Sequence, residues 1–146
     1  MARRLAPENV VLLAALLVAG CWLGPGGRVG ATVTEQVGDL VVARDPTARG
    51  IAAAVNQAQA EAVAIAWIAT RDAMVHDLVV DQSSRVVGLL EVSDTGKALQ
   101  YRSGGPEDDW VILMHGASPK WAHVEALVVV DAASGEVRSG QLAQSN

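Results

Sequence analysis

The chain has 146 residues, of which 51% are apolar, and a formal net charge of −5. The apolar fraction excludes a disordered protein, because disordered chains lack the burial that offsets the entropy of ordering. The acidic balance leaves no basic stripe of the kind that displaces counterions from nucleic acid, so we expect no nucleic-acid partner.

The first twenty residues have the layout of a secretory signal. Arg3 and Arg4 precede an uncharged apolar run at residues 10–19. This run is short for a membrane-spanning helix, which needs about twenty residues. The sequence therefore predicts export, with an uncleaved anchor or a signal peptide cleaved near Gly20 as alternatives.

The end of this run resembles a bacterial lipobox, in which an aliphatic and two small residues precede a cysteine that is lipidated before cleavage. The matching residues are Val18, Ala19, Gly20 and Cys21. The resemblance implies a lipoprotein-type signal peptide at residues 1–20 and lipidation of Cys21. It also implies an extracytoplasmic protein that is attached to the membrane of the cell envelope through its N-terminal lipid or anchor.

The next segment is rich in chain breakers. Five glycines and one proline lie within the seventeen residues after Cys21. Such a density is typical of a flexible tether rather than of a core element. We expect a tether at residues 21–39 and a single α+β domain at residues 40–146.

A helix is predicted after Asp45-Pro46-Thr47, where Asp45 would cap the helix and Pro46 would occupy its first position. Apolar residues then recur at helical spacing, which predicts a buried stripe and a helix that continues to about Thr70. Strand remains an alternative for residues 62–69. The residues of the expected stripe are Ile51, Val55, Ala58, Ala62, Ile65 and Ala69.

Beyond Asp81 the apolar pattern becomes strand-like, in the runs "RVVGLLEV", "KALQYRS", "WVILMHG", "HVEALVVV" and "EVRSGQL". Gly96 and Gly135 stand where hairpin turns need a positive φ, and Gly104-Gly105-Pro106 indicates a wider connection. The expected fold is α+β: one main helix packed on a four- to five-stranded antiparallel meander. The leader would precede it as a signal or anchor helix, followed by the tether.

Residues 126–140, "ALVVVDAASGEVRSG", resemble the closing hairpin of PepSY-type domains, which also occur in the propeptides of secreted proteases. The fit rests on Asp131, Gly135 and Val137. The resemblance implies a small exported α+β unit that inhibits or assists peptidases or binds ligands outside the cell. We therefore expect a non-catalytic binding or inhibitory module for a protein or peptide partner.

The sequence offers little catalytic chemistry. Nucleophile elbows and phosphate-binding loops are missing, so we expect no enzyme, catalytic residue or cofactor. His115 and His123 would offer two nitrogens to a metal only if they met across strands, and Glu107-Asp108-Asp109 is expected in a solvated turn. No metal site is predicted.

An alternative function is a carrier for small apolar ligands. A helix that arches over an antiparallel sheet leaves an apolar pocket in many folds. Trp67 and Trp110, two of only four tryptophans in a chain without phenylalanine, are the candidate walls of such a pocket.

Overall fold

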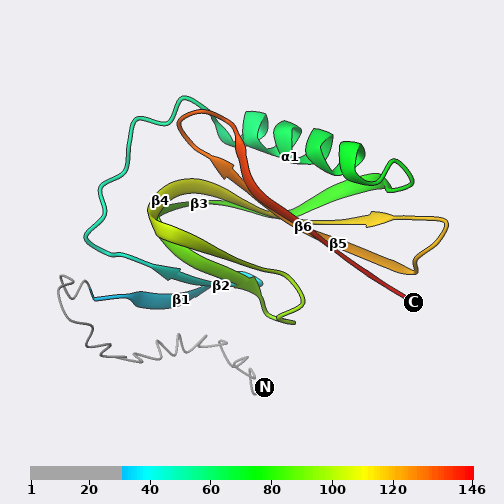
Figure 1. The fold of residues 1–146 in the computed structure, drawn as a ribbon, viewed down its shortest axis with the longest axis horizontal. Helices are drawn as coiled ribbons and strands as arrows, with labels where there is room; N and C mark the ends of the chain where they lie inside the picture. Colours follow the sequence, from blue (N-terminus) through cyan, green and yellow to red (C-terminus); the bar gives the residue numbers. More distant parts are fainter. Residues whose placement is uncertain (1–30) are drawn as a thin grey trace, which may run out of the picture.

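The computed structural model describes residues 31–146, which form a six-stranded antiparallel sheet and one helix (Figure 1). Consecutive strands are neighbours throughout the sheet, in the order β1-β2-β3-β4-β5-β6. The predicted leader at residues 1–20 and its lipidated Cys21 lie outside the described residues. No helix within residues 31–146 has both the length and the apolar character to cross a membrane.

The sheet begins with a hairpin that the sequence did not reveal. Strands β1 (Val33–Val37) and β2 (Leu40–Arg44) pair around Gly38, whose φ is +59°. Leu40 and Val42 of β2 are fully buried. The predicted tether at residues 21–39 is therefore wrong from Val33 onward, because these residues form β1 of the sheet.

The predicted fold, one main helix on a four- to five-stranded meander, is wrong. Residues 31–146 are dominated by a six-stranded sheet, and the single helix among them has only 15 residues. Part of the difference is the β1–β2 hairpin. The rest comes from β3 (His76–Asp94) and β4 (Gln100–Ala117), which are far longer than the expected runs. β5 (His123–Asp131) and β6 (Val137–Ser145) complete the sheet.

Strands β3 and β4 bend sharply together, so that one half of their hairpin curves back across the sheet (Figure 1). Gly88 lies at the bend with a φ of +78°, and a Cβ there would stand only 2.8 Å from that of Ala48. Gly104-Gly105-Pro106, expected to be a connection between strands, continues β4 instead. The strand therefore bends where the sequence predicted a connection between two strands.

The folded-back sheet has two cores, one on each face of β4 and β5. Alternate residues such as Val111 and Val129 pack against the β1–β2 layer, while Ile112 and Val128 pack under the helix. A strand that is buried on both faces needs apolar residues at consecutive positions. This double burial explains the unbroken valines near the end of β5.

Helix α1 (Gln57–Arg71) begins eleven residues after the predicted start. Asn56 caps it through a reciprocal capping box with Gln59, in which each side chain accepts a hydrogen bond from the other's backbone N–H at 2.9 Å. Asp45 caps a local turn at Thr47 instead. The alternative of a strand at residues 62–69 is thereby excluded.

The buried stripe of α1 also differs from the predicted one. The fully buried residues are Ala60, Ala64 and Ile68, whereas Ala58, Ala62, Ile65 and Ala69 of the predicted stripe are exposed. An alanine-rich helix has apolar residues on several sides, so helical spacing alone did not identify the side that faces the sheet.

Candidate functional site

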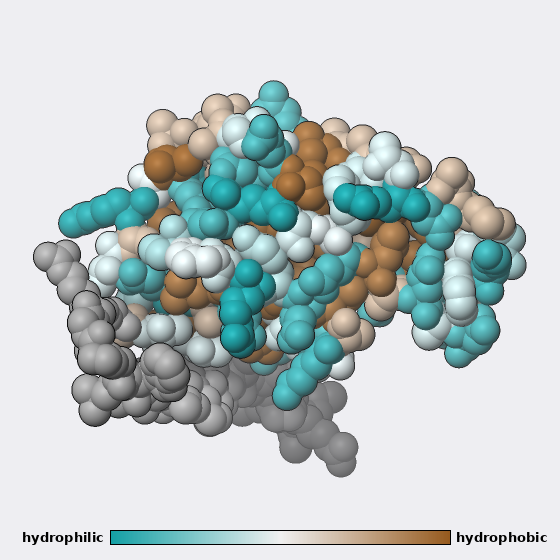
Figure 2. All heavy atoms as spheres, in the orientation of Figure 1, coloured by the Kyte–Doolittle hydropathy of each residue, from teal (hydrophilic) through white to brown (hydrophobic). Residues whose placement is uncertain are grey.

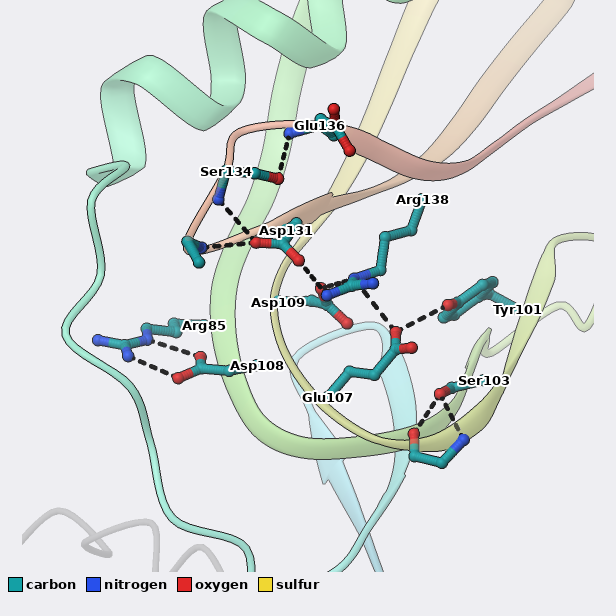
Figure 3. A network of polar contacts seen from close by, with 12 residues as sticks. Arg85, Tyr101, Ser103, Glu107, Asp108, Asp109, Asp131, Ser134, Glu136 and Arg138 are labelled. Atoms are coloured by element: carbon teal, nitrogen blue, oxygen red, sulfur yellow. Dashed lines mark hydrogen bonds and ion pairs between the residues drawn. The ribbon is translucent and has the colours of Figure 1, made fainter.

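A cluster of charged side chains gathers around Arg138, where β6 begins (Figure 3). Val129 pairs with Ser139 but Val130 pairs with Val137, so Arg138 is the extra residue of a β-bulge. The bulge aims its guanidinium at carboxylates from two other strands. Its Nε lies 2.7 Å from Asp109 Oδ1 and 3.2 Å from Glu107 Oε2 of β4, and its Nη2 pairs with Asp131 of β5.

Burial gives this Arg138 cluster unusual electrostatics. Asp109 is fully buried, and its Oδ2 has no hydrogen-bond partner among the described residues. Burial raises the pKa of Asp109 to about 6, although Arg138 opposes this shift. Burial also raises the pKa of Tyr101, which donates a hydrogen bond to Glu107, to about 12. One guanidinium thus faces three carboxyl groups in a poorly solvated site.

A second ion pair holds the chain segment that precedes α1. Arg85 forms a two-pronged contact with Asp108, at 2.9 and 2.7 Å, and also donates a hydrogen bond to the carbonyl of Ile51. The hydrogen bonds from Arg85 lower the pKa of Asp108. Glu107-Asp108-Asp109 is therefore not the solvated turn that we expected, but part of β4 with two buried aspartates.

These charged groups join strands of the sheet. His115 stands opposite Glu125 rather than His123 and contacts Asp81 at 2.6 Å. No group of three or more His, Cys, Asp or Glu side chains within residues 31–146 is arranged to hold a metal ion. The ion pairs of Arg138 have a structural role, because they join β6 to β4 and β5.

The three residues of the predicted hairpin signature meet in the β5–β6 turn. Asp131 Oδ1 accepts hydrogen bonds from the backbone N–H groups of Ala133 and Ser134, at 2.7 and 2.8 Å. Gly135 has a φ of +76°, and Val137 packs against the core under α1. These residues shape the turn. The carbonyl of Ala132 in this turn accepts hydrogen bonds from the backbone of the segment before α1.

The two tryptophans expected to line a pocket lie in the packed layer between α1 and the sheet. The ring of Trp67 covers Gly140 of β6 and lies beneath Arg71, whose guanidinium carbon is 4.7 Å from the ring centroid. Trp110 donates a hydrogen bond from Nε1 to the Val55 carbonyl. Neither tryptophan lines the surface hollow beside Arg44 or the one beside Gln141.

The side of α1 that points away from the sheet is apolar, and no other part of residues 31–146 covers it. We call it the outer face of α1; it consists of Ala58, Ala62, Ile65, Ala66 and Ala69, all of which are exposed. Ile65 has 38% of its surface exposed, and Ile51 and Met74, which precede and follow the helix, have 46% and 45%. In Figure 2, brown and tan residues gather along the rim above α1, with teal ones between them.

No protein family, curated protein or solved structure was found to match this chain. The resemblance of residues 126–140 to PepSY-type hairpins therefore stays a prediction.

Proposed function

We propose that the protein is a non-catalytic binding module of PepSY-like type at the cell envelope, attached to the membrane through its N-terminal leader, and that a protein partner docks on the outer face of α1. The observation that carries this proposal is the exposed apolar row itself. Apolar residues that gather on one exposed side of an element mark interaction sites on soluble proteins, and these five share one side of α1.

The composition of the outer face of α1 indicates the chemistry of the partner. Four of its five residues are alanines, so a second backbone can approach the helix closely. The face carries no charge, and Ile65 stands near its middle as the one large side chain. An apolar helix of the partner protein, laid along this row, fits these features.

The charged residues support a binding role rather than catalysis. Arg85 and Arg138 are each engaged by carboxylates within the fold. These groups stabilise the scaffold on which α1 lies, because the Arg85–Asp108 pair holds the segment leading into the helix. A rigid scaffold that presents one apolar helix face is suited to recognition.

The proposal is tested by placing a charge on the outer face of α1. The full-length chain, carrying an affinity tag, is crosslinked in native cell envelopes, and the captured proteins are compared with those captured by Ile65→Lys and Thr70→Lys. Thr70 is exposed but lies outside the outer face of α1, so its variant is the matched control. We expect Ile65→Lys to lose about tenfold or more of one captured protein, because a lysine would be desolvated in the interface.

The Thr70→Lys variant should capture that protein at the parent level. Equal capture by both variants, or no protein captured by the parent chain, would contradict the proposed function. Circular dichroism of both variants checks that α1 remains folded.

A further inference from the structure

Strand β6 forms one end of the sheet and pairs only with β5. The backbone N–H and C=O groups on its other side, within residues 139–145, have no hydrogen-bond partner among the described residues. Such an edge is a template for pairing with another strand, and proteins usually protect it with charges, prolines, bulges or short length.

β6 carries little of this protection. It is nine residues long and contains neither proline nor lysine. Its bulge is confined to Arg138 at the beginning of the strand, and its only charge is turned inward toward Asp109. The edge strand at the other end, β1, has five residues, and Glu35 at its centre pairs with Arg44 at 3.0 Å. The two edges are therefore not equivalent.

We infer that a second copy of this chain pairs with β6, strand to strand and antiparallel, to make a two-fold symmetric dimer with a continuous sheet of twelve strands.

The sequence of β6 is complementary to itself in this arrangement. The regular part of the strand is residues 139–145, and a two-fold axis at its centre places Leu142 of the two copies opposite each other. Ser139 then faces Ser145, Gly140 faces Gln144, and Gln141 faces Ala143. All of these residues are uncharged, so the pairing brings no like charges together, which would be destabilising across strands.

Charge opposes a second copy less at this edge than elsewhere on the surface. The chain has a net charge of −5, so two copies repel each other over most of their surfaces. Residues 139–145 themselves carry no charge, and Asp72, which lies beside Gln144, accepts a hydrogen bond from it. Two-fold dimers are the commonest oligomers of soluble proteins, because one self-complementary patch is used twice.

The dimer would present two binding helices on one side. α1 lies over β6, since Trp67 covers Gly140 and Gln144 donates a hydrogen bond to Asp72 at 2.8 Å. A two-fold axis perpendicular to the joined sheet therefore places both α1 helices on the same face. A partner with two docking segments would then bind with higher avidity than one segment allows.

The dimer is tested by disulfide crosslinking of the full-length chain in mild detergent, with Cys21→Ser as the background. Leu142→Cys places a thiol at the proposed axis, and Thr34→Cys in β1 is the matched control at the other edge. Residues directly opposite in an antiparallel pair have Cα atoms about 4.5–5.5 Å apart, within disulfide range. We expect most Leu142→Cys chains, and few Thr34→Cys chains, to become covalent dimers upon oxidation.

The unmodified protein gives an independent readout. Light scattering should yield twice the chain mass at micromolar concentrations, and amide exchange within residues 139–145 should slow as dimers form. A mass of one chain at every concentration, or equal crosslinking at both edges, would overturn the dimer. Neither result bears on the proposed partner site, because capture through Ile65 is measured separately.

Discussion

Single residues at the contact between α1 and β6 explain why this small helix stays on the sheet. The Trp67 ring needs the space above Gly140, where a Cβ would stand 2.7 Å from Trp67 Cε3. Glycine is required there for close approach rather than for an unusual φ. The contact joins the helix to an edge strand that has few other apolar residues.

We predict that Gly140→Ala destabilises the protein by about 1–3 kcal/mol, because the rigid indole must move or the helix must lift from the sheet. The free energy of unfolding in urea measures this cost. Gly104→Ala is the matched control within a strand, since a Cβ at Gly104 meets nothing within 4 Å. A Gly140→Ala variant as stable as Gly104→Ala would show that Trp67 does not pack as described.

The residues of the candidate site differ in how far local sequence could predict them. Asp131 and Gly135 act within their own turn, so the local pattern revealed both. Asp109 and Arg138 are 29 positions apart and meet only because β4 and β6 come together. No local spacing signals such a pair, which is why residues 107–109 resembled a solvated acidic turn.

At the scale of elements, the cap of α1 decides where the helix begins. Asn56 satisfies an N–H of the first turn, and Gln59 returns a hydrogen bond to the Asn56 backbone. Asp45 has the same chemistry and caps a turn, but the chain after it is held extended by Gly88, Arg85 and Ala132. Those partners are distant in sequence, so the local pattern at Asp45 could not show that the helix begins elsewhere.

We predict that Asn56→Ala lowers the free energy of unfolding by about 1 kcal/mol through loss of the capping box. Exchange of the first backbone amides of α1 should accelerate as well. Asp45→Ala is the matched control, because it removes an Asx turn without touching α1. Faster exchange in α1 after Asp45→Ala, but not after Asn56→Ala, would contradict the observed helix start.

The strands show the same limit of local reasoning. The end of α1 near Thr70 and the strand character beyond Asp81 were predictable, because each follows from the period of the apolar residues. The joining of two expected strands into the long β4 was not, because Gly104-Gly105-Pro106 has the composition of a turn. Residues of β1 and β2 pack in the core on the inner side of the bend, and β1 was hidden in a glycine-rich segment.

At the scale of the whole molecule, carboxyl groups in several places link stability to pH. Four carboxyl groups have a lowered pKa, so their contribution is present above the unfolded value of 3.8 and is lost as the pH falls through their folded values. They are Asp45, Asp72, Asp108 and Asp131. Asp109 acts in the opposite direction, since burial, together with the charge of Glu107, raises its pKa to about 6 against the opposing effect of Arg138.

The contribution of Asp109 to the free energy of unfolding falls as the pH rises, and it does so over a defined pH range. Between pH 3.8 and about 6 the folded state holds a proton on Asp109 that the unfolded chain releases. Stability from this group is therefore fully present below pH 3.8 and is lost as the pH rises through about 6. Asn resembles the protonated carboxyl, so Asp109→Asn should match the parent at pH 4 and become more stable than it, by on the order of 2 kcal/mol, at pH 7.5.

Urea unfolding of both proteins at several pH values measures this difference. The contributions of the four aspartates with a lowered pKa cancel, because both proteins contain them. Glu91→Gln, a change at an exposed ion pair with Arg102, should leave the profile of the parent nearly unchanged, since surface pairs contribute little. A constant difference between Asp109→Asn and the parent from pH 4 to 7.5 would mean that Asp109 is solvated. The Arg138–Asp109 pair would then behave as an ordinary surface ion pair rather than as a pair with a buried charge.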